Sequence, residues 1–115
     1  MKNRGFPQRF ACALRGIGEG LRSERSLRTQ SVAVTAVVAI LAFRRAPPVW
    51  WALASLACGG VLAAELMNTA IEKLADHLHP ERHAAVRILK DCAAGAVLVA
   101  CLAALGVAVA YVRTL

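Results

Sequence analysis

Four polar side chains interrupt a long apolar stretch of this sequence without breaking its helical pattern. They are Glu65, Asn68, Glu72 and Asp76, within the segment ELMNTAIEKLAD at 65–76. On a helix of about 3.6 residues per turn, they fall within an arc of about 80° and form one stripe. Residues 50–64 ahead of them carry no charge, so Glu65 is expected at or below a membrane surface. An ionisable side chain at that depth is costly, which makes it a candidate for function.

Further charged residues supply groups that could work with this stripe. They are Glu24, Arg82, Arg87, Lys90 and Asp91. Carboxylates can hold Mg²⁺ on phosphate oxygens, a lysine can neutralise phosphate charge, and a carboxylate can take the proton of an acceptor hydroxyl. This inventory favours phosphoryl transfer to a lipid, although the sequence has no Walker motif and no kinase glycine-rich loop. The alternative is a polar stripe that only holds helices together, but such contacts mostly use Ser, Thr or Asn.

The composition predicts an integral membrane protein. The chain has 115 residues, of which 58% are hydrophobic, and its mean hydropathy is +0.55, which fits one membrane domain. A removable signal peptide is not expected, because basic residues and glycines precede the first apolar run. The net charge of +7 suits anionic headgroups and a phosphate-bearing ligand better than nucleic acid, because Lys and Arg flank apolar segments and aromatic residues are only 5%.

Cysteine and histidine give weaker signals. The four cysteines form no CxxC pair, so they are interpreted as small packing residues. His77, His79 and His83 suggest zinc only weakly without thiolates, and a polar loop is the better interpretation.

The apolar pattern predicts an all-α fold with three transmembrane helices and an N-terminal amphipathic surface helix. The surface helix is expected over 6–27, because its apolar residues repeat on one face. The three spans are expected over 28–45, 49–76 and 91–112, with a loop over 77–90 between the last two. The first span has an apolar core of only thirteen residues at 31–43 and would cross if flanking arginines snorkel.

The distribution of basic residues predicts the orientation. Eleven Lys and Arg lie before Ser31 or in 73–90, against three at 44–45 and 113, which places the N-terminus and the 77–90 loop in the cytoplasm. Three helices are too few to surround Glu65, and Ala96, Ala100 and Ala104 form a small-residue stripe, so a homo-oligomer is expected.

The segments ELMNTAIEKLAD, HPERH and LKDCAAGAVL resemble the prokaryotic diacylglycerol kinase family, which also contains the undecaprenol kinases. The resemblance extends from about residue 9 to the end. The signature is a glutamate, an asparagine three residues later, the run NTAIE, an aspartate four beyond, and a Lys-Asp pair before a small-residue helix. The matching positions are Glu65, Asn68, Glu72, Asp76, Lys90 and Asp91, together with Glu24 and Arg28 upstream.

The resemblance implies a homotrimer of three-span subunits in the bacterial inner membrane, where ATP and a lipid alcohol meet at the interface. It implies that Glu65 is the general base, supported in catalysis by Asn68 and Asp76, and that Glu24 and Glu72 bind Mg²⁺. The implied nucleotide contacts are Glu24, Glu72, Glu81, Arg82, His83, Lys90 and Asp91. The lipid is expected to meet Glu65, Arg28 and Trp51. Two departures are Cys12, where some members carry a tyrosine, and Gln30, where others have an acid or histidine.

The sequence leaves two lipid acceptors open. Diacylglycerol, giving phosphatidic acid, is favoured over undecaprenol, although residues 23–28 and 93–98 look closer to the undecaprenol kinase branch. A more distant alternative is a small multidrug or ion transporter, which is also short, oligomeric and built around one membrane glutamate. That alternative predicts a fourth span and does not explain Lys90 and Asp91.

Overall fold

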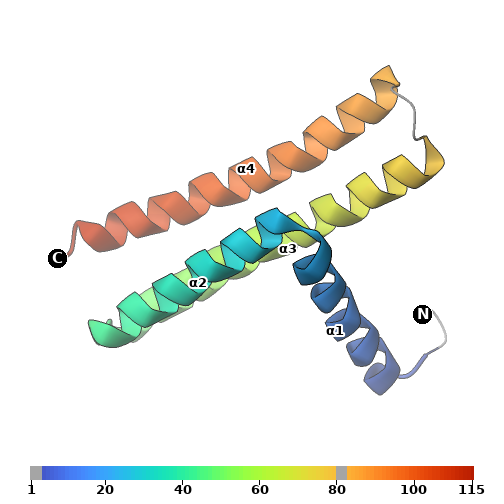
Figure 1. Cartoon of the computed structure of the whole chain (residues 1–115). Coiled ribbons are helices and arrows are strands. Elements are labelled where there is room, and N and C mark those ends of the chain that lie inside the picture. Colours follow the sequence, from blue (N-terminus) through green and yellow to red (C-terminus); the bar gives the residue numbers. More distant parts are fainter. Residues whose placement is uncertain (1–3, 80–82) are drawn as a thin grey trace.

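The computed structural model describes residues 4–79 and 83–115, and these fold into four helices without a strand. In chain order the helices are α1 (Phe6–Ser23), α2 (Arg25–Phe43), α3 (Pro48–Leu78) and α4 (Ala84–Val112). Figure 1 shows α2, α3 and α4 running alongside one another, while α1 leaves the bundle at a steep angle. The predicted all-α class is confirmed.

The three bundle helices have the length and composition of membrane spans. In the described part of the chain, α2, α3 and α4 are each long and apolar enough to cross a bilayer. Many of their large apolar side chains point outward, with Leu56 76% and Val99 68% exposed. Such a surface would be unfavourable in water and is covered by hydrocarbon in a lipid bilayer. The chain is therefore a membrane protein with three candidate spans, as the sequence predicts.

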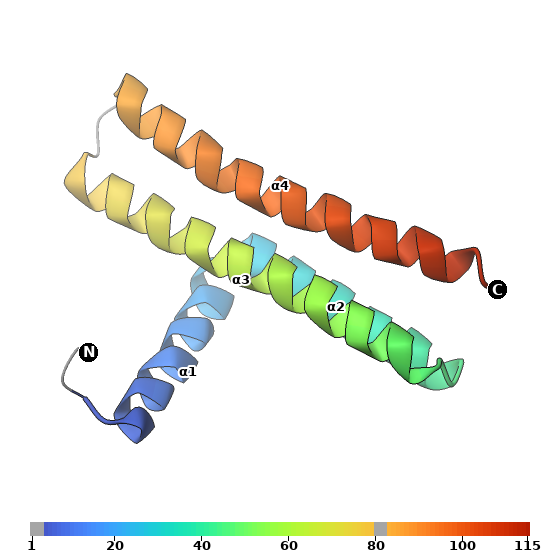
Figure 2. The same ribbon diagram turned by 180° about the vertical axis from the view of Figure 1, so that it is seen from behind.

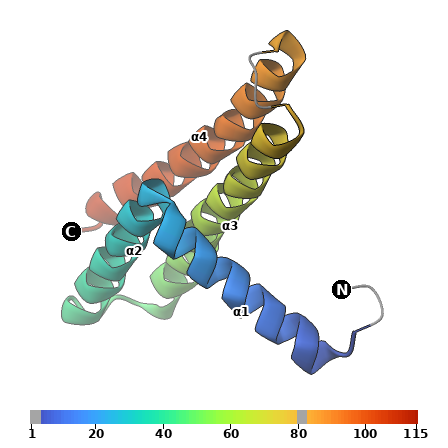
Figure 3. The ribbon, with the colours of Figure 1, turned by 45° about the vertical axis from the view of Figure 1, so that its right-hand side comes forward.

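Helix α3 lies at the centre of the bundle. It packs along α4 most extensively and also against α2, whereas the backbones of α2 and α4 stay farther apart in the described residues. Figure 2 shows α3 alongside α4 and in front of α2, and Figure 3 shows α1 projecting away from the other three helices. The small interior is formed by apolar side chains: Leu27, Leu41, Val61, Ala75, Val86 and Ala93. Because α3 contacts each of the other three helices, it is the element against which the site residues are positioned.

The boundary between α1 and α2 differs from the single helix expected over 6–27. Helix α1 ends at Ser23, and Glu24 has an extended backbone (φ −116°, ψ 116°) before α2 begins at Arg25. The physical reason is a tertiary contact: the Arg28 side chain folds back and donates to the last carbonyls of α1. The apolar side chains Phe6 and Phe10 of α1 are exposed, and the location of this helix on the membrane surface stays a prediction.

The two remaining junctions are a tight turn and a capped helix start. After α2, Arg45 adopts a left-handed conformation (φ 51°), and the Ala46 N–H donates to the Leu41 carbonyl, which closes the turn before α3. Helix α4 begins at Ala84, seven residues ahead of the span expected from 91, and His83 caps it by accepting from the Ala85 N–H. A helix can be longer than its membrane-embedded part, so the limits of the span itself stay predictions.

Candidate active site

The predicted polar stripe lies on one helix, α3, and runs from the interior of the protein to its surface. Glu65 is only 5% exposed and Asn68 is also buried, whereas Glu72 is half-buried and Asp76 is exposed. These residues recur every three or four positions, so the helix aligns them along its axis. The stripe therefore joins a buried carboxylate to an accessible surface.

The buried carboxylate of Glu65 is held by a residue from α2. Gln30 Nε2 donates a hydrogen bond to Glu65 Oε2 over 3.3 Å. The sequence marked Gln30 only as a departure from the family, although a polar side chain near the start of an apolar helix was a signal that it faces other polar groups.

A second amide serves the next carboxylate of the stripe. Asn68 Nδ2 donates to Glu72 Oε1 over 3.3 Å, which orients the Glu72 side chain along α3. Three buried oxygens in this region have no hydrogen-bond partner among the described residues: Gln30 Oε1, Asn68 Oδ1 and Thr69 Oγ1. Buried polar atoms are nearly always paired in proteins, so this cluster is suited to a ligand, water or another polar group. Thr69 was not identified from the sequence.

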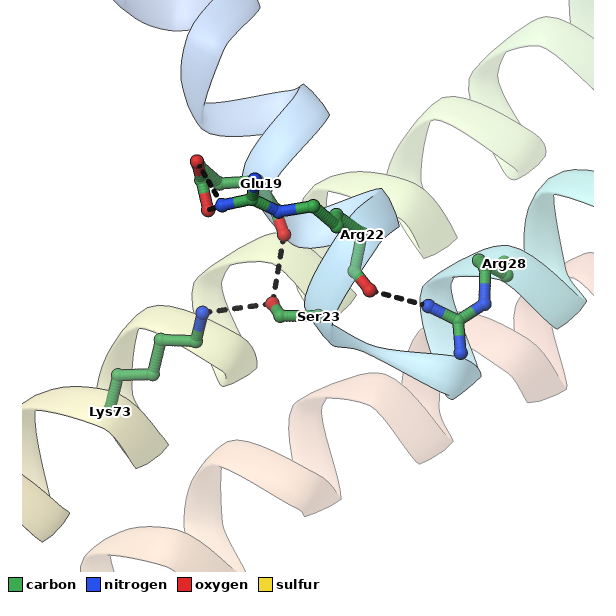
Figure 4. A network of polar contacts seen from close by, with 5 residues as sticks. All are labelled: Glu19, Arg22, Ser23, Arg28 and Lys73. Carbon is green, nitrogen blue, oxygen red and sulfur yellow. Dashed lines mark hydrogen bonds and ion pairs between the residues drawn. The ribbon is translucent and has the colours of Figure 1, made fainter.

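The end of α1 is fastened to α2 and α3 by polar side chains, as Figure 4 shows. Lys73 Nζ donates to Ser23 Oγ over 2.9 Å, and Arg28 Nη1 donates to the carbonyls of Leu21 and Arg22 over 2.9 and 2.8 Å. Ser23 precedes Glu24, and Lys73 follows Glu72. The Ser23–Lys73 contact therefore brings the chain segments of the two predicted metal ligands together.

Close packing reinforces this junction at Gly20, which is buried. A Cβ atom at Gly20 would lie 2.8 Å from Leu27 Cδ2 and 3.1 Å from Leu66 Cδ2. Glycine is therefore the residue that lets α1 approach α2 and α3 this closely.

Two carboxylates, Glu24 and Glu72, are the metal donors that the Ser23–Lys73 contact brings onto neighbouring segments. No group of three or more His, Cys, Asp or Glu close enough to hold a metal occurs within residues 4–79 and 83–115. Magnesium typically uses one or two carboxylates and completes its shell with phosphate oxygens and water. Glu24 and Glu72 are both half-buried and lie on segments in contact, so they suit an ion that arrives with a nucleotide.

The residues of α4 that are predicted to contact the nucleotide lie at the outer end of the stripe. Lys90 Nζ donates to Asp76 Oδ1, and Asp91 beside it is exposed. His83 uses Nδ1 to cap α4, so its other ring nitrogen is the one that could meet a ligand. The predicted contacts Glu81 and Arg82 lie outside the described residues.

The two residues expected to meet the lipid with Glu65 have different surroundings. The Arg28 guanidinium binds backbone carbonyls of α1, which gives it a structural task at the junction. Trp51 lies fourteen residues before Glu65 on α3, or roughly 21 Å along the helix at about 1.5 Å per residue. At that distance Trp51 could meet only a lipid tail when a headgroup lies at Glu65.

Comparisons with known proteins agree with the motifs of this site. Residues 11–112 match the family model described as "Prokaryotic diacylglycerol kinase". A protein of Bacillus subtilis named "Undecaprenol kinase" is 36% identical over 94 residues, which cover 82% of this chain and 76% of that protein. A Synechocystis protein named "Diacylglycerol kinase" is 32% identical over 96 residues, which cover 83% of this chain but only 55% of that protein.

Proposed function

We propose, given that this chain belongs to the prokaryotic diacylglycerol kinase family of lipid kinases, that it transfers the γ-phosphoryl group of ATP to the hydroxyl of diacylglycerol. The observation that carries the proposal is the buried Glu65 at the inner end of a carboxylate stripe that reaches the surface. The family match favours a lipid kinase over the transporter alternative.

In this mechanism Glu65 is the general base. The lipid hydroxyl would reach Glu65 from the hydrocarbon side, and a carboxylate can take the hydroxyl proton as the oxygen attacks phosphorus. Asn68 orients Glu72 and, through its unpaired oxygen, offers an acceptor to the reacting groups.

Glu24 and Glu72 would hold the magnesium ion of the nucleotide. The ion, when bound, neutralises charge on the phosphate oxygens. Lys90 adds a positive charge at the outer end of the stripe, where Asp76 orients its ammonium group. Asp91, His83, Glu81 and Arg82 complete the proposed nucleotide contacts.

Undecaprenol is the second candidate acceptor. It is supported by the Bacillus subtilis relative, because the match covers 82% of this chain and 76% of that protein. Diacylglycerol is supported by the Synechocystis relative, at similar identity. Both lipids offer a terminal hydroxyl to the same carboxylate, so the choice depends on how the tail packs against the helices.

The deciding experiment measures lipid-dependent ATP consumption by the purified protein in nanodiscs that contain diacylglycerol, undecaprenol or neither. We expect ATP use above background with lipid acceptor present, faster with diacylglycerol, and phosphatidic acid as the labelled product. Glu65→Gln should lower this rate by roughly 10²–10⁴-fold, the range typical of a lost general base. Faster phosphorylation of undecaprenol would replace the proposed acceptor, and near-wild-type turnover of Glu65→Gln would remove the base assignment.

We further propose that the protein works as a homotrimer in the bacterial inner membrane with its N-terminus in the cytoplasm. The outward-facing apolar side chains of the bundle leave ample surface for other copies of the chain. Native mass spectrometry from detergent should show three times the 12.2 kDa chain mass. A species of one chain that is fully active would contradict the proposed assembly.

A further inference from the structure

Gln30 of α2 faces Glu65 of α3 across the contact between these helices. Its Nε2 lies 3.3 Å from Glu65 Oε2, although the two residues are 35 positions apart in the sequence. Glu65 is buried and Gln30 is half-buried, so water competes weakly for this hydrogen bond. In such surroundings a hydrogen bond to a charged group is stronger than in water.

When Glu65 is ionised, its carboxylate determines which end of the Gln30 amide faces it. A carboxylate only accepts hydrogen bonds, so the NH₂ group of Gln30 must point toward Glu65. The amide oxygen, Oε1, is then directed elsewhere, and it is buried without a hydrogen-bond partner in the described part of the chain. Among the described residues, the amide therefore keeps a buried oxygen without a partner while it directs an N–H at the carboxylate.

A second contact between an amide and a carboxylate occurs within α3. Asn68 gives its amide nitrogen to Glu72, and its own Oδ1 is buried without a partner among the described residues. Two amides from different helices therefore each serve one carboxylate of the stripe. The repetition indicates that the amides orient the carboxylates rather than simply joining the helices.

We propose that Gln30 is a positioning residue for Glu65. It holds Oε2, so that Oε1, which receives no hydrogen bond from the described residues, is left to face the acceptor hydroxyl. This inference rests on the proposed function. In that step the hydroxyl O–H bond breaks, its proton binds Glu65 Oε1, the alcohol oxygen bonds to the γ-phosphorus of ATP, and the bond to the departing ADP breaks.

The amide can also serve Glu65 after the proton has moved. A protonated carboxyl carries an O–H donor, and an amide turned by half a rotation presents its oxygen to accept that hydrogen bond. Gln30 therefore has a suitable atom for each protonation state of the base. A leucine of similar bulk has neither atom, which makes Gln30→Leu the informative substitution.

The test is to compare the kinetics and stability of Gln30→Leu with the wild type. We expect kcat for lipid phosphorylation to fall about tenfold to a hundredfold, the effect of losing a group that orients a reacting side chain. The KM values for ATP and lipid should stay unchanged, because orientation of the base acts in the chemical step. The thermal unfolding midpoint should change little, because leucine removes the hydrogen bond to Glu65 but also a buried oxygen that has no partner among the described residues.

Thr35→Val is the matched control on the same helix. Its hydroxyl donates to the Ser31 carbonyl within α2, so its removal takes away a polar group without touching Glu65. This variant should keep wild-type kcat and KM. If Thr35→Val loses as much kcat as Gln30→Leu, the effect belongs to polarity of the helix in general, and the positioning role is overturned.

A double-mutant cycle links the effect to the carboxylate. In the Glu65→Gln background, Gln30→Leu should leave the residual turnover unchanged, because the amide acts through Glu65. The positioning role is overturned if Gln30→Leu lowers kcat equally in both backgrounds, or if it leaves kcat at the wild-type value. It is also overturned if Gln30→Leu raises KM and lowers the unfolding midpoint. Near-wild-type turnover of Glu65→Gln alone is a different failure, because it removes the proposed base and the role of Gln30 with it.

Discussion

Lys90 of α4 donates a hydrogen bond to Asp76 of α3 and forms an ion pair with it across the helical hairpin. The two side chains are 35% and 64% exposed. An ion pair this accessible typically contributes about 0.2–1 kcal/mol to stability. The pair therefore does little to hold α3 and α4 together, and its value is better explained by the orientation it gives to the lysine ammonium.

Exchanging Asp76 and Lys90 separates the stabilising role of the ion pair from its role in orienting the lysine ammonium. In the double variant Asp76→Lys with Lys90→Asp the ion pair can re-form, so the unfolding midpoint should stay within a few degrees of the wild type. Turnover should remain at least tenfold lower, because the positive charge that is proposed to meet phosphate has moved to the other helix. Steady-state kinetics and thermal unfolding check both expectations. Recovery of wild-type turnover in the exchanged protein would show that only the pairing matters.

Glu72→Gln should raise the Mg²⁺ concentration needed for half-maximal rate. The reason is that sites of this kind rest on one or two carboxylates together with phosphate oxygens. Glu24→Gln should act in the same direction, since the Ser23–Lys73 contact joins the two segments. The measurement is a Mg²⁺ titration of ATP turnover.

Glu19→Gln is the control for the magnesium titration. Glu19 is an exposed carboxylate on α1 that pairs with Arg22 on its own helix. Its replacement should leave the titration unchanged. If the Mg²⁺ concentration for half-maximal rate rises equally in Glu19→Gln, the effect comes from bulk electrostatics. If it rises in neither Glu24→Gln nor Glu72→Gln, other ligands hold the ion.

Gly20→Ala should loosen the junction between α1 and the bundle. Its new Cβ atom would lie 2.8 Å from Leu27 Cδ2, and Leu27 is only 2% exposed and has little room to move. Overpacking of this kind typically costs about 1–3 kcal/mol, against about 1 kcal/mol gained by replacing glycine in a helix. Thermal unfolding should therefore show a lower or unchanged midpoint, and the Mg²⁺ requirement should rise as Glu24 moves away from Glu72.

Gly18→Ala provides the comparison for Gly20, because among the described residues no atom beyond the adjoining turns of α1 lies within 4 Å of a Cβ at that position. It should raise the midpoint slightly by helix propensity alone. If Gly18→Ala and Gly20→Ala behave alike, the close approach at Gly20 has no energetic importance.

Arg28→Met distinguishes a structural arginine from a lipid-binding one. Loss of the hydrogen bonds to Leu21 and Arg22 should lower the unfolding midpoint and raise the Mg²⁺ requirement, while the KM for lipid changes little. Each hydrogen bond from a charged donor is worth about 1.5–3 kcal/mol. A raised lipid KM at unchanged stability would instead support the predicted contact with substrate.

The sequence was sufficient for features that depend on periodicity within one helix. The stripe from Glu65 to Asp76 follows from the 3.6-residue repeat, and the candidate spans follow from apolar length. The interruption at Glu24 could not be predicted in this way, because no glycine or proline marks it. It depends on Arg28 reaching back to α1, which is a tertiary contact.

The hydrogen-bond partner of the buried Glu65 carboxylate could not be predicted from the sequence pattern either. The Gln30–Glu65 hydrogen bond joins residues on two helices, and it depends on how α2 is rotated about its axis against α3. Helix α4 starts at Ala84 because residues 84–90 are good helix formers behind the His83 cap, whereas apolarity alone indicated a start at 91.

Helix α3 is a single rod of 31 residues, about 46 Å long at about 1.5 Å per residue. The hydrocarbon of a typical bilayer is about 30 Å thick, so α3 must project from the membrane or tilt within it. The same rod is embedded in lipid at its start and carries the carboxylate stripe on its second half. Bilayer thickness would then set the depth of Glu65 relative to the headgroups, and the acyl-chain length of the host lipid would control how readily the proposed base meets a lipid hydroxyl.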